Sequence, residues 1–172
     1  MAKNKVFLLF LTFFACFLFV AVSLLLNSKV KNKIGVAYAG EQEIFKEVFP
    51  DAASFRPVKS EGKIIYYKAL DYSKKFMGAV FKASSVGYCS TIESLVGMYK
   101  DGTIIAIKIL KQNETLGLGS RIVEREFTRQ FSNNKDLSNM QAVTGATTSS
   151  RAVTESVKAK ASEILALTKD EK

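Results

Sequence analysis

The sequence predicts an α+β fold, in which helices pack on an antiparallel sheet, preceded by one N-terminal transmembrane helix. Three observations lead to this prediction: an uncharged apolar run near the N-terminus, several β-rich segments in the middle, and helical periodicity towards the C-terminus. The order helix, strands, helix, loop, helix is typical of an α+β domain. We therefore expect a tail (1–5), a transmembrane helix (6–26), a juxtamembrane linker (27–40) and one domain (41–172).

The apolar run extends from Val6 to Leu26 and contains 21 residues without a charge. About 20 residues are needed to cross the hydrocarbon core of a bilayer, whereas the apolar part of a signal peptide has about 7–15. Ala37-Tyr38-Ala39 resembles a cleavage site, but it lies well beyond the run. We interpret the run as an uncleaved anchor, with a cleaved signal as the alternative. Lysines flank it on both sides, so charge does not set its orientation.

The composition limits the classes of function that the chain could have. The net charge of +9 could suit nucleic acid, a membrane surface or an acidic ligand. Because the lysines are scattered, we expect a solvated basic surface on a membrane-tethered domain and no nucleic-acid partner. The chain has no histidine, the commonest metal ligand and neutral-pH acid–base group, so neither a metal site nor a catalytic residue is expected. Cys16 lies in the apolar run and cannot pair with Cys89 across the bilayer, and we expect Cys89 to be a buried thiol.

The first part of the domain predicts a short helix followed by strands. Glu41–Phe49 places its apolar residues on one side, and Pro50 ends the helix. Segments rich in β-branched and aromatic residues predict four strands: Lys63–Leu70, Phe76–Ala83, Thr91–Lys100 and Thr103–Leu110. Asp101-Gly102 between the last two is a strong hairpin signal, and Ser84–Ser90 is expected to be a turn.

The second part predicts two helices separated by a polar loop. Arg121–Phe131 is amphipathic and offers three apolar side chains for packing, namely Ile122, Phe127 and Phe131. The polar loop Ser132–Asn139 follows. Beyond it, apolar residues recur at spacings of three and four, which marks one face of a helix: Val153, Val157, Ala161, Ile164 and Leu165.

A hydroxyl-rich segment, residues 143–151 (VTGATTSSR), stands where this last helix begins. Serine and threonine cap helix starts by accepting an unpaired backbone N–H. The free first-turn N–H groups and the positive end of the helix dipole also favour an anion. Gly145 allows a tight turn or a close approach to a ligand. The segment therefore predicts either a simple helix cap or hydroxyls beside a phosphate site.

A glycine loop, residues 113–120 (NETLGLGS), lies between the hairpin and the first of these helices. Two glycines in a loop are weak evidence by themselves, and no Rossmann pattern follows. Together with the hydroxyl-rich segment, however, the loop carries a resemblance. Thr144-Gly145-Ala146-Thr147 resembles the flavinylation motif of FMN-binding domains in the G subunit of Rnf electron-transport complexes, and the C subunit of sodium-translocating NADH:quinone reductase has a similar one.

In that family the motif reads Asp-x-x-Ser/Thr-Gly-Ala-Thr, and Gln141 occupies the Asp position here. Glu114 to Gly119 is similar to the second family signature, Glu-Thr-x-Gly-Leu-Gly, with Leu116 where the family often has proline. The resemblance spans about residues 41–167. It implies that FMN is bound covalently through a phosphoester to Thr147. The implied cofactor-binding residues are Thr144, Gly145, Ala146, Thr147, Thr148, Glu114, Thr115, Gly117, Leu118 and Gly119.

The resemblance also implies roles for single residues. Thr115 and Leu118 would be neighbours of the isoalloxazine ring, while Gly117 and Gly119 would allow close backbone approach. For Glu114 we expect a loop-shaping hydrogen bond. Tyr88 we expect to be a packed aromatic at a strand end.

The implied function is that of an electron-carrier subunit of an ion-translocating Rnf-type oxidoreductase. Its partners would be the other subunits of the membrane redox complex, a flavin transferase and the membrane itself. It would be a single-pass protein of the inner (cytoplasmic) membrane with its domain on the outer, periplasmic side. Two alternatives stay open: an FMN-binding domain that serves another extracytoplasmic reductase, and a membrane-anchored binding or structural domain without flavin.

Overall fold

The computed structural model of the chain describes residues 40–169. The expected transmembrane helix 6–26, Cys16 and the linker up to residue 39 lie outside the described residues. Within residues 40–169, no helix has both the length and the apolar character needed to cross a membrane.

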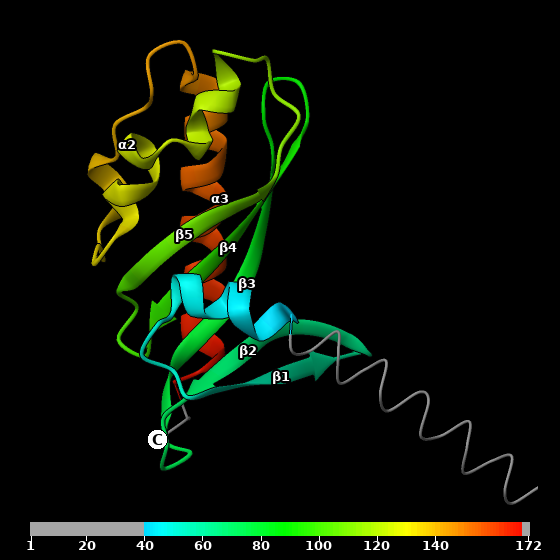
Figure 1. The fold of residues 1–172 in the computed structure, drawn as a ribbon, viewed down its shortest axis with the longest axis vertical. Helices are drawn as coiled ribbons and strands as arrows, with labels where there is room; N and C mark the ends of the chain where they lie inside the picture. The colour runs from blue at the N-terminus through cyan, green and yellow to red at the C-terminus, as the bar shows by residue number, and fades with distance from the viewer. Residues whose placement is uncertain (1–39, 170–172) are drawn as a thin grey trace, which may run out of the picture. The chain divides into compact units, whose positions relative to one another are not determined.

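Five antiparallel strands form one sheet in which each strand pairs with its neighbour in sequence (Figure 1). Their bounds are β1 Ser54–Ser60, β2 Lys63–Leu70, β3 Phe76–Val86, β4 Thr91–Tyr99 and β5 Ile104–Lys111. The predicted antiparallel sheet with packed helices is confirmed. Strand β1 was not predicted. It contains Pro57, which lacks a backbone donor, and an edge strand is where the sheet tolerates that loss.

Most strand boundaries agree with the prediction, and β2 agrees at both ends. Strand β3 runs beyond Ala83 to Val86, which pairs with Thr91, so the turn between β3 and β4 is shorter than predicted. The Asp101-Gly102 hairpin is confirmed. The Asp101 carboxylate accepts the backbone N–H and the hydroxyl of Thr103 at 3.0 and 2.9 Å, and Gly102 takes φ +90°.

The helices differ more from the prediction. Residues 40–48 are helical as expected, and α3 (Thr147–Leu167) is the long C-terminal helix. The single helix predicted over 121–131 is wrong. Three short pieces take its place: η1 Gly119–Val123, α2 Arg125–Thr128 and η2 Arg129–Phe131. The backbone of Glu124 is extended (φ −66°, ψ 147°), which separates the first piece from the second. A further short helix, η3 Leu137–Asn139, lies in the polar loop.

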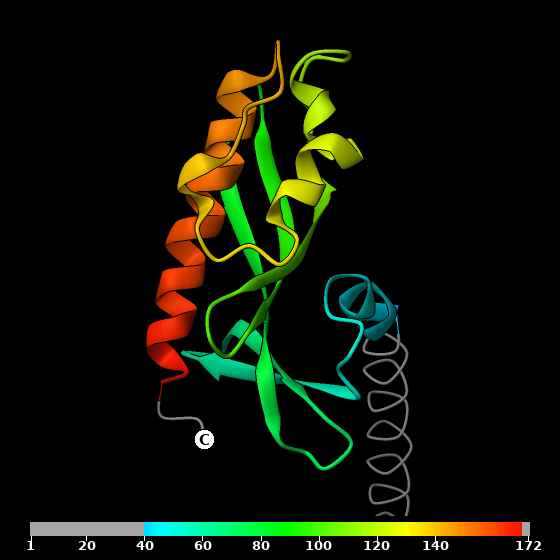
Figure 2. The same cartoon turned by 90° about the vertical axis from the view of Figure 1, so that its left-hand side faces the viewer.

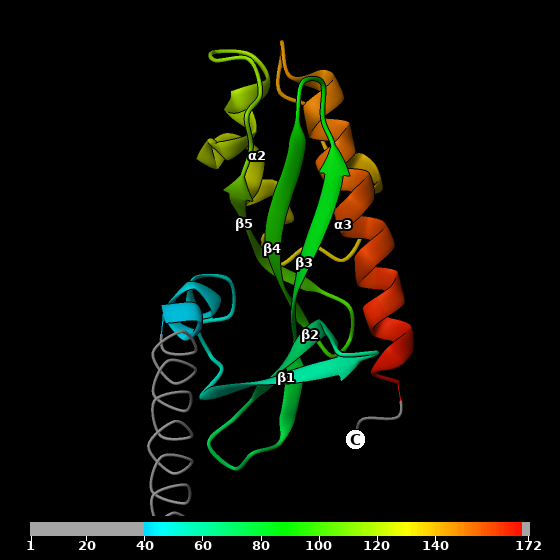
Figure 3. The same ribbon diagram turned by 90° about the vertical axis from the view of Figure 1, so that its right-hand side faces the viewer.

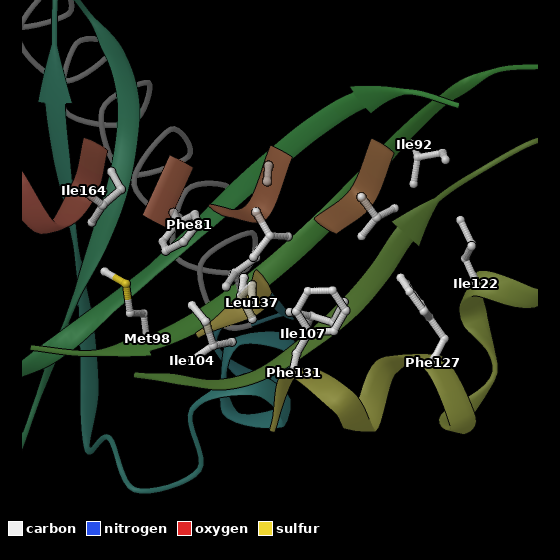
Figure 4. Packing of buried hydrophobic residues seen from close by; sticks show 14 of the residues in the cluster. Phe81, Ile92, Met98, Ile104, Ile107, Ile122, Phe127, Phe131, Leu137 and Ile164 are labelled. Atoms are coloured by element: carbon white, nitrogen blue, oxygen red, sulfur yellow. The ribbon is translucent and has the colours of Figure 1, made fainter. Parts of the chain in front are cut away.

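The sheet carries a hydrophobic core on each face. Helix α3 covers one face of the sheet (Figure 2). Buried side chains of η1, α2 and η2 belong to the same core cluster as those of α3 and the sheet (Figure 4). The predicted packing residues Ile122, Phe127 and Phe131 are all fully buried there, together with Val153, Val157 and Ile164 of α3. Helix 40–48 covers part of the other face (Figure 3), where Phe45, Val48 and Phe49 pack on Tyr67, Val80 and Leu95.

Helix 40–48 approaches the sheet closely at Gly97 of β4. A Cβ atom at Gly97 would overlap the carbonyl oxygen of Val48 and lie 2.8 Å from its carbonyl carbon. The hydroxyl of Tyr99, at the end of the same strand, donates to Asp51 at 2.9 Å just after the helix. The end of the helix therefore rests directly on the backbone of β4.

Candidate functional site

Three loops meet at one end of the sheet: the β3–β4 turn, the glycine loop and the start of α3 (Figures 1 and 3). Between them lies a pocket of about 340 Å³, which we call the end pocket. Its lining residues are Tyr88, Glu114, Thr115, Leu118, Gly119, Gly145, Ala146, Thr147, Thr148 and Ser149. The two sequence motifs, far apart in the chain, thus form the walls of one site.

Helix α3 begins inside the hydroxyl-rich segment, at Thr147. Its N-cap residue is Ala146, and no side chain caps the helix. Of the two alternatives, the simple serine or threonine cap is therefore wrong, because the hydroxyls of residues 147–150 lie within the first turn. In the described part of the chain, the backbone N–H groups of Thr147, Thr148 and Ser149 have no acceptor outside the helix. This open, positive helix end is suited to an anion.

The hydroxyls of the segment fall into two groups. Ser149 and Ser150 are buried and used internally: Ser149 donates to the Glu114 carboxylate at 2.7 Å, and Ser150 accepts the backbone N–H of Val143 at 3.1 Å. Thr147 and Thr148 are exposed and line the end pocket, and among residues 40–169 their hydroxyls have no hydrogen-bond partner. Of the four hydroxyls of residues 147–150, only those of Thr147 and Thr148 are thus free to react or to contact a ligand.

The loop before α3 is fixed against the glycine loop. Gly145 takes φ +81°, and a Cβ atom there would lie 3.0 Å from a methyl carbon of Leu118. The guanidinium of Arg121 donates to the carbonyl oxygen of Thr144 at 3.1 Å. The loop before α3 is therefore held against Leu118 of the glycine loop and against Arg121 of η1.

Glu114 connects all three walls of the pocket. It is 8% exposed. One carboxylate oxygen accepts the backbone N–H of Ser90 at 2.8 Å, its hydroxyl at 2.9 Å and the N–H of Cys89 at 3.1 Å. The other accepts the N–H of Tyr88 at 3.0 Å and the hydroxyl of Ser149. The predicted loop-shaping hydrogen bond is thus confirmed, and it is a network rather than one bond.

This network controls the charge of Glu114. Burial by itself would raise the pKa of the carboxyl group, but the hydrogen bonds from Ser149, Ser90 and Cys89 outweigh burial and lower the pKa from 4.5 to about 2. Glu114 is therefore ionised at neutral pH. A carboxylate that is already ionised and fully hydrogen-bonded is a poor base. Glu114 therefore contributes hydrogen bonds that join the walls of the pocket, and a negative charge.

Glycines surround the carboxylate. A Cβ atom at Gly87 would lie 2.6 Å from one Glu114 oxygen, and one at Gly119 would lie 2.8 Å from the other. Gly119 therefore allows the close approach of the Glu114 carboxylate, and its approach to a ligand stays a prediction. Gly117 has a different role: a Cβ atom there would meet nothing within 4 Å, but its φ of +73° favours glycine. The positive φ therefore explains why glycine stands at position 117, since no neighbouring atom of the protein would exclude a side chain there.

Two side chains in the β3–β4 turn contradict their predictions. Tyr88 is 76% exposed at the end pocket instead of packed. Cys89 is exposed instead of buried, with its sulfur 3.4 Å from the hydroxyl of Thr115. The cause is the same for both: their backbone N–H groups point inward to Glu114, so their side chains point outward.

Sequence reasoning did not anticipate how Gln141 is held. Its backbone N–H donates to the side-chain oxygen of Gln130 at 2.8 Å, and its carbonyl accepts from the side-chain nitrogen of Gln130 at 3.1 Å. The Gln141 side chain itself is exposed. The start of the motif is therefore tied to η2 through the backbone, which leaves the side chain at position 141 facing solvent.

Residues 87–162, which include both motifs and the residues that line the end pocket, match the FMN-binding domain family. The G subunit of the ion-translocating oxidoreductase complex of Methanosarcina acetivorans is 35% identical over 133 residues, which cover 68% of this chain and 71% of that protein. The G subunit of the proton-translocating ferredoxin:NAD(+) oxidoreductase complex of Clostridium ljungdahlii is 33% identical, with 74% of each chain covered. The chain belongs to this family of G subunits.

The fold has a counterpart among solved structures. NqrC of Shewanella oneidensis aligns with a TM-score of 0.51 at 16% sequence identity, over 67% of this chain and 72% of that chain. At this identity the similarity supports the fold alone.

Proposed function

We propose that the protein is a membrane-anchored electron-carrier subunit of an ion-translocating Rnf-type oxidoreductase complex, with FMN bound covalently through a phosphoester to Thr147. One observation carries this proposal: the exposed Thr147 hydroxyl stands at the open N-terminus of α3, inside a pocket built from both motifs of an FMN-binding family member. The names of the related G subunits support the assignment to such a complex.

The residues of the end pocket fit FMN. The uncapped first turn of α3 offers N–H groups to the phosphate. The side chains of Leu118 and Tyr88, exposed at 50% and 76%, offer apolar surface to the ring. The volume of about 340 Å³ falls within the range of ligand pockets. Thr144, Gly145, Ala146 and Thr148 would shape the phosphate side, and Thr115, Gly117 and Gly119 the ring side. Bound FMN supplies the redox chemistry, while the protein supplies attachment and electrostatics.

The covalent attachment of FMN to Thr147 requires a second protein. In the step we propose, the Thr147 hydroxyl oxygen bonds to the phosphorus of an FMN unit held in a phosphoanhydride donor. The bond from that phosphorus to the donor's leaving phosphate breaks, and the hydroxyl proton passes to a base. Within the described residues nothing hydrogen-bonds to this hydroxyl, and the chain has no histidine to act as the base. A flavin transferase must therefore supply both the base and the donor site.

The direct test is the intact mass of the full chain, purified after expression with and without a flavin transferase. With the transferase, we expect the mass to rise by that of FMN less one water, together with flavin fluorescence that survives denaturation. Without it, the mass should equal that of the polypeptide. A chain that stays at the unmodified mass with an active transferase would support the binding or structural alternative instead.

The membrane anchor is a separate part of the proposal, since Val6–Leu26 is long and apolar enough to span a bilayer. We expect the full-length chain to stay in the membrane pellet after an alkaline carbonate wash. A soluble product that begins near Gly40 would show that the run is a cleaved signal. Co-purification with other redox subunits from washed membranes would separate the Rnf-type complex from a different extracytoplasmic reductase.

A further inference from the structure

The charge of Glu114 is not balanced by a cation. Its five hydrogen-bond donors are backbone N–H groups and hydroxyls, which are neutral. The ion pairs found among residues 40–169 join other residues, and none includes Glu114. Neutral donors stabilise a carboxylate but do not cancel its charge, so one full negative charge stays in the wall of the end pocket.

This charge is also isolated in sequence. Residues 84–92, 112–120 and 143–150 contain no lysine, arginine or aspartate, and Glu114 is their only glutamate. Arg121 and Arg151 directly follow two of these segments, but the ion pair of Arg121 is with Glu124, and no ion pair of the described residues joins either arginine to Glu114. Its side chain lies against the backbone of Gly87 and Gly119, where an added Cβ atom would come within 2.6–2.8 Å. The pocket therefore encloses a carboxylate of this length and holds it in one position.

We propose that the Glu114 carboxylate is a positioning residue that holds the three walls of the end pocket together, and that its negative charge lowers the reduction potential of FMN bound there. The inference rests on the proposed function. Reduction adds electrons to the ring, and a fixed negative charge beside the ring disfavours the reduced form. The effect makes the bound cofactor a stronger electron donor.

Two substitutions separate charge from shape. Glu114→Gln keeps the length of the side chain but removes the charge, while Glu114→Asp keeps the charge but shortens the side chain. Both disturb the hydrogen bonds to Ser90 and Ser149. If the charge acts as proposed, a redox titration of the flavinylated full chain gives an upward shift of the midpoint for Glu114→Gln. Glu114→Asp should stay near the wild-type value.

An unchanged or lowered midpoint in Glu114→Gln, or equal shifts in both variants, would overturn the electrostatic role. A wild-type chain that never acquires flavin would instead refute the proposed function, so the two failures are distinct. Should Glu114→Gln fail to acquire flavin, Ser149→Ala decides the matter. It removes one hydrogen-bond donor from the carboxylate and leaves the negative charge in place and less stabilised. Its midpoint should fall below that of the control Ser150→Ala, whose hydroxyl bonds to Val143 and not to Glu114, and equal midpoints would refute the proposal.

Discussion

Thr147→Ala is expected to abolish covalent FMN attachment completely. The substitution removes the hydroxyl oxygen that forms the proposed phosphoester, and the neighbouring serine hydroxyls are already buried and engaged with Glu114 and Val143. The measurement is flavin fluorescence of the denatured chain in a gel, together with its intact mass. Thr147→Ser, which keeps a hydroxyl at the same place, should restore attachment.

Thr148→Ala is the matched control. Thr148 is also exposed, lines the same pocket and lies in the same first turn of α3. Exposed positions of this kind change stability little when substituted, so folding should be equal in the two variants. We expect Thr148→Ala to carry covalent FMN at the wild-type level. If it loses the flavin while Thr147→Ala keeps it, the acceptor is Thr148.

Gly97→Ala should destabilise the domain by about 3 kcal/mol, the upper end of the usual cost of overpacking a core. The added methyl group would overlap the carbonyl oxygen of Val48, which is backbone and cannot rotate away. Helix 40–48 would have to lift from β4, exposing Val48 and Phe49, which are both at most 1% exposed. Chemical denaturation of the purified full chain measures the change in the free energy of unfolding.

Gly40→Ala serves as the comparison for this experiment, because a Cβ atom at Gly40 would meet nothing within 4 Å. We expect the free energy of unfolding to stay within about 0.5 kcal/mol of the wild type, as for most surface substitutions. If Gly97→Ala were equally stable, the contact between helix 40–48 and β4 would be looser than the structure indicates.

The sequence predicted which side chains are buried better than how the backbone runs. Ile122, Phe127 and Phe131 are fully buried as their spacing indicated, yet the helix expected to contain them is interrupted. Periodicity reports on the buried face, whereas the extended conformation of Glu124 is set by how η1 and α2 pack on the sheet. Strand β1 was missed because its stability comes from pairing with β2, a contact between segments that its own composition, with Pro57, does not indicate.

At the candidate site, too, the sequence predicted some features and missed those that depend on contacts between distant segments. The two motifs are recognisable in the sequence, and they do lie together at the pocket. The Glu114 network was foreseen only as one bond, because most of its donors are backbone N–H groups, and every residue other than proline has one. Its partners lie 24 to 35 residues away along the chain. The exposure of Tyr88 and Cys89 follows from that network, so residue type alone gave the wrong answer for both.

The simple order of the sheet has a consequence for the biogenesis of the protein. Strands that pair only with sequence neighbours make mostly local contacts, and such topologies fold quickly. Helix α3 is the last element of the domain, and it both completes one core and contributes Thr147. A chain whose synthesis or folding stops before α3 docks therefore has no finished acceptor site. Under the proposed attachment, a covalent flavin would mark chains that have finished folding, and maturation would act as a quality check before assembly.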